Sequence, residues 1–196
     1  MDVKDEFVDV LSGAELEALL NAPSIKSILG LRNRVVMTLM AVCGLKVSEV
    51  CNLRVVDVEL DVRKPFIRVC NTGKKERLVF MDSNTIDLMY LWLERKPRRF
   101  RALFPVIKSG KRTFGKAEPG RAISPNSVRN MVRHFAKKAG IKKRVHPGML
   151  RKNKERKKES EKKIKNNMLI VIKELIELKK YVSKRIDLIT EKININ

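Results

Sequence analysis

The sequence predicts a mainly helical protein with a small antiparallel β-sheet, followed by a basic amphipathic helix at the C-terminus. Apolar residues recur at helical intervals in several segments, two short alternating segments flank a turn-like stretch, and the chain becomes lysine-rich beyond residue 152. With 196 residues, 43% of them hydrophobic, the chain can form one domain with a sizeable core. We therefore expect a domain at residues 1–152 and a helical extension at residues 153–196.

The first two helices are predicted from their start and stop signals. Ser12 and Glu15 have the spacing of a capping box, and the helix that they begin is expected to end near Pro23. Residues 31–43 are apolar at the intervals of a buried helix, and Gly44 is placed to form a left-handed C-terminal cap.

The later helices are predicted in the same way. Ser48 can cap a short helical stretch within residues 47–58, and residues 84–94 have the pattern of an amphipathic helix. Ser124 precedes a proline in the first turn of a further helix, which is expected to end at Gly140.

A β-hairpin is predicted between these helices. Residues 66–70 and 77–81 alternate β-branched or apolar side chains with polar ones, and the sequence NTGKKE separates them. The turn of this hairpin therefore carries cations. Two more basic segments, at residues 96–101 and 108–121, contain proline or glycine and are expected to form loops.

The charge balance favours a polyanionic partner. The chain has 44 lysines and arginines against 22 acidic residues, a formal net charge of +22, and such an excess attracts polyanions through steering and counterion release. Double-stranded DNA is the expected partner, and an anionic membrane surface is the alternative. We find no run of about 18 apolar residues and no signal peptide, so we expect a cytoplasmic protein associated with DNA rather than with a membrane.

The expected DNA contacts lie in three basic regions: the hairpin tip, the loops, and the exposed face of the helix that follows Ser124. They are Lys74, Lys75 and Arg77; Arg98, Arg99, Lys111 and Arg112; and Arg129 and Arg133.

The three cysteines give no sign of a disulfide or a metal site. Cys43, Cys51 and Cys70 lie in apolar sequence surroundings without a CxxC pair or histidines at ligand spacing. We expect buried thiols in a reducing compartment, and no metal or other cofactor.

The C-terminal extension has its own pattern. From Arg151 to Lys165 cations dominate and Ile164 is the only sizeable apolar side chain, which is typical of a solvated or DNA-contacting segment. Apolar residues then follow spacings of four and three, which is the pattern of a helix seam that binds another helix. These residues are Ile164, Met168, Val171, Leu175, Leu178, Val182 and Ile189.

Several motifs occur together in one order: GLKVSEVCNL, the hairpin segment KKERLVF, a basic loop with LFP, and AGIKKRVHPGMLRK. From roughly Leu11 to Lys152 the chain thereby resembles the catalytic domain of the tyrosine recombinases, the phage-integrase and Xer-like family. The resemblance implies the fold of that domain and a role in DNA integration or site-specific recombination. Members of the family break DNA by attack of a tyrosine hydroxyl on a phosphodiester, and two arginines, a histidine and a lysine stabilise or protonate the transition state.

The family's first arginine and its hairpin lysine are both replaced in this sequence. Lys46 occupies the first arginine position in GLKVSEV, so it keeps the charge but lacks the two-pronged guanidinium. Thr72 occupies the lysine position in NTGKKER, which removes the expected general acid, although Lys74 lies two residues further along.

The family's H-x-L-R motif is partly kept. Gly148 occupies the histidine position, His146 lies two residues earlier, and Arg151 matches the second arginine. Beyond Arg151 the resemblance ends, yet Tyr181 lies near the expected separation of the nucleophile. An ordinary aromatic residue on an amphipathic helix is the competing interpretation of Tyr181.

We therefore expect a DNA-binding member of the family that is catalytically impaired. The enzyme alternative is an active recombinase that forms a 3′-phosphotyrosyl intermediate through Tyr181. The third hypothesis is an interaction protein that binds a partner through its C-terminal helix. Besides DNA, the candidate partners are a second copy of the chain, in a homo-oligomer, and an intact recombinase that supplies the catalysis in a mixed assembly. Only about ten residues precede the first helix, so we expect the N-terminal DNA clamp of most relatives to be missing.

Overall fold

The computed structural model describes residues 10–70, 76–107 and 120–194, although the side chains of residues 156–158, 181, 182 and 184–194 lie outside the description. The chain divides into two compact units, Met1–Glu155 and Arg156–Asn196. Helix α6, Pro147–Asn194, begins in the first unit and makes up the described part of the second.

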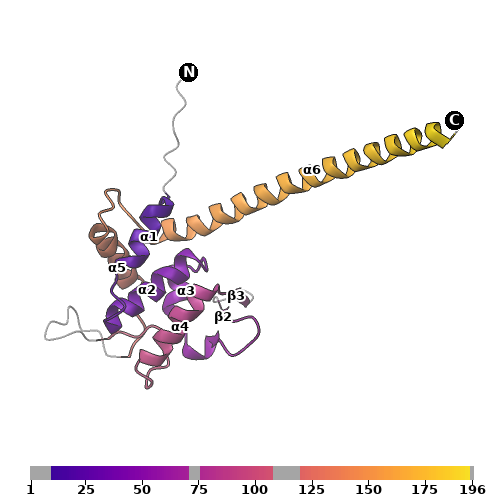
Figure 1. Cartoon of the computed structure of the whole chain (residues 1–196). Coiled ribbons are helices and arrows are strands. Elements are labelled where there is room, and N and C mark those ends of the chain that lie inside the picture. The colour runs from indigo at the N-terminus through magenta and orange to yellow at the C-terminus, as the bar shows by residue number, and fades with distance from the viewer. Residues whose placement is uncertain (1–9, 71–75, 108–119, 195–196) are drawn as a thin grey trace. The chain divides into compact units, whose positions relative to one another are not determined.

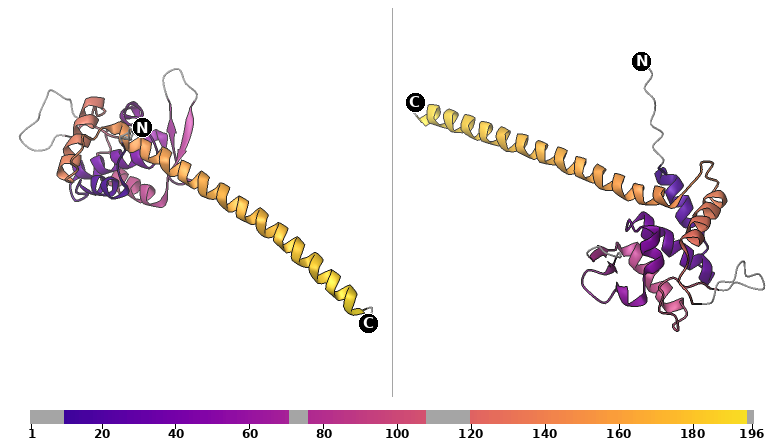
Figure 2. Two further views of the ribbon diagram at one scale, coloured as in Figure 1. Left: turned by 90° about the horizontal axis from the view of Figure 1, so that it is seen from above. Right: turned by 180° about the vertical axis from the view of Figure 1, so that it is seen from behind.

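The first unit is helical with one small sheet, as Figures 1 and 2 show. Its helices before α6 are α1 (Gly13–Asn21), α2 (Ile28–Ala41), α3 (Val47–Asn52), α4 (Ser83–Arg95) and α5 (Pro125–Lys138). A 3₁₀ turn η1 (Val55–Asp57) leads into strands β1 (Val58–Glu59), β2 (Phe66–Val69) and β3 (Arg77–Phe80). The strands pair antiparallel in the order β1-β2-β3, with Phe66 opposite Phe80 and Val69 opposite Arg77.

The predicted fold class, mainly α with a small antiparallel sheet, is confirmed, and most predicted caps are present. Ser12 and Glu15 form a reciprocal capping box at α1. Ser124 caps α5 through the Ser127 backbone N–H, with Pro125 in the first turn. Gly44 and Gly140 both have a φ of 73°, the left-handed conformation expected after a helix.

The prediction that Ser48 caps α3 is wrong. Helix α3 begins at Val47 after an extended Lys46, so Ser48 lies inside its first turn. The Lys46 backbone N–H donates to the Glu49 carboxylate at 2.8 Å, so the cap comes from the third helical residue reaching back. The helix ends at Asn52 because Leu53 is extended.

The core forms around α2, which packs against α1, α3 and α4. Residues of α2 from Val35 to Ala41 are all buried, which accounts for the nearly continuous apolar sequence there. On α4, Trp92 is fully buried, stacks on Phe104 and donates its indole N–H to the Leu103 carbonyl at 3.0 Å. This contact attaches the 101–106 segment to the core.

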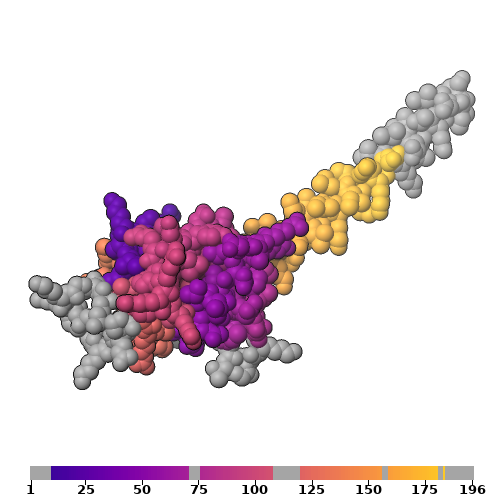
Figure 3. Space-filling view, turned by 90° about the horizontal axis from the view of Figure 1, so that it is seen from below, coloured from indigo at the N-terminus to yellow at the C-terminus, as the bar shows by residue number. Residues whose placement is uncertain are grey.

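Figure 3 shows a face of the first unit on which the connection between β1 and β2 adjoins α4. Across this boundary the Tyr90 hydroxyl donates to the Asp61 carboxylate at 3.1 Å. Desolvation and this hydrogen bond raise the pKa of Tyr90. The contact orients the connection against the helix.

The first turns of α6 are anchored in the first unit. The Asn153 amide donates to the Leu11 carbonyl at 3.1 Å, and the Lys154 ammonium donates to the Cys43 carbonyl at 2.7 Å. Lys154 thus binds a carbonyl just beyond the C-terminal end of α2, where cations are favoured. The contacts of the first unit therefore extend past Lys152, the last residue of the predicted domain.

The second unit consists of a single helix in the described residues. Its apolar side chains between Ile164 and Leu178 are between 45% and 67% exposed. No helix in the part of the chain that the structure describes is long and apolar enough to cross a membrane.

The cysteines only partly match the expectation of buried thiols. All three are free, and Cys43 and Cys51 are buried, but Cys70 is exposed. Alternation along β2 buries Ile67 and Val69, so the next residue along the chain, Cys70, points the other way. Burial raises the pKa of Cys43 and Cys51 to about 11.

We expect one thiol per native chain to react rapidly with a chromogenic disulfide reagent at pH 8. Cys70 supplies it, because Cys43 and Cys51 are buried and protonated at this pH. Absorbance should report all three thiols once the protein is unfolded in guanidinium. Cys70→Ser should remove the rapid phase, and a rapid phase that survives this substitution would contradict the assignment.

Candidate functional site

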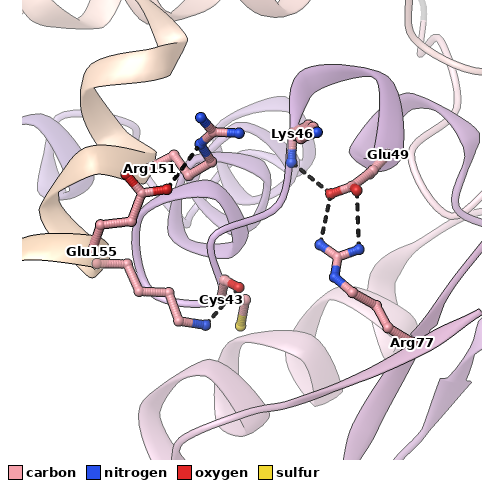
Figure 4. Close-up of polar contacts among 7 residues, drawn as sticks. Cys43, Lys46, Glu49, Arg77, Arg151 and Glu155 are labelled. Carbon is pink, nitrogen blue, oxygen red and sulfur yellow. Dashed lines mark hydrogen bonds and ion pairs between the residues drawn. The ribbon is translucent and has the colours of Figure 1, made fainter. Parts of the chain in front are cut away.

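A cavity of about 210 Å³ brings together two segments that are far apart in the sequence. Lys46, Gly148 and Arg151 line it together with Val47 and Pro147, and Met40 and Leu45 complete the wall. Lys46, Gly148 and Arg151 are the residues that the sequence analysis assigned to the family's first arginine, histidine and second arginine. Figure 4 shows Arg151 on α6 beside the segment that carries Lys46.

Lys46 is positioned by the start of α3. Its backbone N–H is bound by Glu49, and the turn before it is closed by the Leu45 N–H, which donates to the Leu39 carbonyl at 3.2 Å. The Lys46 residue is exposed, so its ammonium is accessible to an anion. Hydrogen bonds therefore hold the backbone at Lys46 in place, while its ammonium stays accessible.

Glu49 links this segment to the hairpin. Its side chain is 1% exposed, and both carboxylate oxygens accept from the Arg77 guanidinium, at 3.0 and 2.9 Å. Figure 4 shows this two-pronged pair between α3 and β3. A buried carboxylate needs such partners, because an unpaired buried charge costs several kcal/mol.

Arg151 lies on the second turn of α6. Its Nε atom is 3.5 Å from a Glu155 carboxylate oxygen, too far for a hydrogen bond, and is buried without a hydrogen-bond partner among the described residues. The side chain as a whole is 38% exposed. The guanidinium thus retains donor capacity beside the cavity.

Gly148 is not surrounded by empty space. A Cβ atom built on Gly148 would lie 3.1 Å from both Nδ1 and Cε1 of His146, which is tighter than an ordinary van der Waals contact. The His146 imidazole therefore lies beside the position from which a histidine at 148 would extend. The sequence shows that His146 and Gly148 are two positions apart, but it does not show that the His146 ring approaches the Gly148 backbone.

Several predicted site residues lie outside the described residues. These are Thr72, Lys74, Lys75, Lys111 and Arg112, together with the side chain of Tyr181. Their predicted roles stay predictions.

The predicted DNA contacts that are described differ in their surroundings. Arg129 and Arg133 are exposed on α5, and Arg98 and Arg99 are exposed after α4, where Arg99 lies 4.8 Å from the centre of the Phe100 ring. Arg77 is different, because Glu49 already engages its guanidinium. Its predicted DNA contact would compete with a structural ion pair.

The sequence did not identify Glu49 as a site residue. One signal was available: Glu49 is an acidic residue three positions after Lys46, which is the spacing of the reaching-back half of a capping box. Its pairing with Arg77, 28 residues further along, was not accessible from local pattern. No three histidine, cysteine or acidic side chains gather as a metal site in the parts of the chain with described side chains.

The described residues around this cavity can hold an anion. Lys46 and Arg151 present positive charge to one cavity, which suits a phosphate group. Gly148 contributes neither a proton nor a hydrogen-bond donor from a side chain.

Comparisons with known proteins identify the family to which a chain with this fold belongs. The profile of the phage integrase family matches residues 9–155, and the chain belongs to this family. It is 34% identical over 141 residues to the tyrosine recombinase XerD of Pseudomonas putida, which covers 72% of this chain and 45% of that protein. The tyrosine recombinase XerC of Myxococcus xanthus is 30% identical over 142 residues, covering 72% and 46%.

Solved structures agree on the fold. The crystal structure of XerA recombinase superposes with a TM-score of 0.59 at 26% identity, over 74% of this chain and 48% of that one. XerH recombinase bound to its difH substrate gives a TM-score of 0.57 at 23% identity, over 74% and 41%. The chain thus matches less than half the length of these relatives.

We expect Arg77→Ala to lower the free energy of unfolding by about 2 kcal/mol, because it removes the two hydrogen bonds that the guanidinium donates to the buried Glu49 carboxylate. Urea denaturation followed by circular dichroism measures this. Arg68→Ala is the matched control on the neighbouring strand. Its pair with Glu76 is exposed on both sides, so its loss should cost less than about 1 kcal/mol. Equal costs for the two substitutions would contradict the structural role of the Glu49–Arg77 pair.

Proposed function

We propose that this chain binds double-stranded DNA as a phage integrase family protein and does not cleave it. The observation that carries the proposal is the cavity in which Lys46, Gly148 and Arg151 meet. Two cations remain where the family holds the scissile phosphate, and the histidine position between them has no side chain. Phosphate binding is thereby retained in part and proton transfer is lost.

The transition-state stabilisation that the three substitutions would remove supports a protein that binds DNA without cleaving it. Removing one preorganised donor from a transition state costs about 3 kcal/mol, or roughly a hundredfold in rate. Here the first arginine, the hairpin lysine and the histidine are replaced by Lys46, Thr72 and Gly148. Even with Lys46 compensating part of one loss, the remaining deficit makes turnover negligible.

The charge of the chain supports DNA as the partner. Exposed arginines on α5 and after α4 contribute to a net charge of +22, and the XerH site-specific recombinase, which has a similar fold, is bound to its difH substrate in its solved structure. Contacts to phosphates position a protein without reading sequence, so we propose only modest sequence preference.

We expect the logarithm of the DNA association constant to fall with the logarithm of salt concentration, with a slope of about −0.9 for each phosphate contacted. Replacing Arg129 and Arg133 together by Ala should reduce the magnitude of this slope by about 2 and weaken binding on every duplex. Fluorescence anisotropy over a salt series measures both effects.

The matched control is Arg63→Ala with Lys64→Ala, which removes the same two positive charges from the exposed connection between β1 and β2. This pair should leave the slope nearly unchanged, since neither residue belongs to the proposed contact surface. If the slope changes equally in both variants, binding depends on net charge and not on a contact surface at α5. An affinity of the unaltered chain that does not change with salt concentration would contradict DNA binding itself.

We expect no covalent protein–DNA adduct when the chain is incubated with nicked suicide duplexes and then denatured, because the proton donors are missing. Denaturing gel electrophoresis of labelled DNA detects such an adduct. An adduct that Tyr181→Phe abolishes would contradict the proposal and establish the active-recombinase alternative with Tyr181 as nucleophile.

The reverse experiment restores the family residues through Lys46→Arg, Thr72→Lys and Gly148→His. A histidine at 148 would meet the His146 ring, so His146→Ser is included to make room for it. The same three restorations with His146 retained form the control. Weak cleavage that appears only with His146→Ser would support the steric role of the ring.

A further inference from the structure

The described part of the second unit exposes an apolar helix surface. Between Ile164 and Leu178, helix α6 carries nine large apolar side chains that are each at least 45% exposed; they are Ile164, Met168, Leu169, Ile170, Val171, Ile172, Leu175, Ile176 and Leu178. An exposed surface of this kind on a long helix is typical of an interface. At 100° per residue, all of them except Ile170 fall on one half of the helix.

The spacing along this surface selects another helix as the occupant. Ile164, Met168, Val171, Leu175 and Leu178 follow each other at intervals of four, three, four and three, which assigns them to alternating d and a positions of a heptad. Side chains at this spacing insert between those of a facing helix. A lipid surface requires a wide apolar face but not this regular seam.

The charges beside the seam select a second copy in parallel orientation. In this register Glu174 is at a g position and Lys179 is at the following e position. In a parallel pair of identical helices, each g residue faces the e residue five positions further along in the other copy. Glu174 of each copy would therefore meet Lys179 of the other, whereas antiparallel packing pairs g with g and e with e.

Neither residue has an alternative partner on its own helix. The side chains three and four positions before and after Glu174 are Ile170, Val171, Glu177 and Leu178, none of which is basic. Lys179 has no acidic residue at these distances, and no ion pair involves Glu174 or Lys179 among the described side chains. By contrast, Glu177 and Lys180 at the outward c and f positions pair within the helix at 2.9 Å.

We propose that α6 is a self-association element that forms a parallel, in-register coiled coil with α6 of a second copy of this chain. The seam runs through at least Ile164–Leu178 and is oriented by reciprocal Glu174–Lys179 pairs. This proposal is independent of DNA binding, and its test contains no DNA.

The first experiment measures the mass of the full chain by sedimentation equilibrium. The unaltered protein should associate, and Leu175→Glu should weaken association by at least about a hundredfold, because it places charge in the seam. Ile170→Glu is the matched control: it makes the same chemical change on the same helix but opposite the seam, so association should persist. A chain that is monomeric at tens of micromolar, or equal effects of the two substitutions, would overturn the proposal.

The second experiment tests orientation through charge. Glu174→Lys should weaken association by about tenfold by replacing each attraction with a repulsion, and adding Lys179→Glu should restore it. Glu177→Lys applies the same charge change at an outward position and should have little effect. If the double variant associates as weakly as the single one, the parallel pairing is wrong.

Disulfide trapping gives an independent answer. In a Cys70→Ser background, which removes the exposed thiol, Ile164→Cys and Leu178→Cys should each form a covalent homodimer on oxidation. Antiparallel helices would instead link the two variants only when they are mixed. Association that requires anionic vesicles, with a monomeric chain in their absence, would assign the apolar face to a membrane surface and overturn the proposal.

Discussion

The buried carboxylate of Glu49 is the constraint on which the site depends. With 1% of its side chain exposed, this carboxylate needs hydrogen-bond donors, and the Lys46 backbone N–H and the guanidinium of Arg77 are among those that it has. One group therefore fixes where α3 begins, how β3 lies against it, and where Lys46 stands. At position 46 the interaction uses the backbone N–H, so it does not depend on which side chain this residue carries.

Much of the fold was predictable because its signals are local. Capping side chains, glycines at a positive φ and the alternation of β2 and β3 act within a few residues, and they placed α1, α2, α4, α5 and the hairpin. The failures have non-local or competing causes. Helix α3 is capped by Glu49 and not by Ser48. Cys70 is exposed because it follows the buried Val69 at the end of β2. Arg77 is held by the buried carboxylate of Glu49, which lies 28 positions away in the sequence, so no local pattern could predict this contact.

In the candidate site, too, the sequence predicted which residues are present but not all of the contacts between them. Motif positions alone named Lys46, Gly148 and Arg151, and the structure gathers them around one cavity. Pattern could not show that the His146 ring lies against Gly148, because that contact depends on how the turn before α6 folds. Glycine at this position leaves room for the ring, and the ring in turn occupies part of the space that a side chain at 148 would need. The two residues form a coupled pair, so their substitutions should not act additively.

Helix α6 combines two kinds of sequence in one element. Its first turns are held by side-chain hydrogen bonds from Asn153 and Lys154 to Leu11 and Cys43, whereas its residues from Ile164 onward have no such support within the described chain. An isolated helix gains little from propensity alone, and most helical stability comes from packing an apolar face. The seam through Met168 and Leu175 would supply that packing if a second copy covers it. The stability of the second half of α6 should therefore depend on protein concentration, while the anchored first turns should not show this dependence.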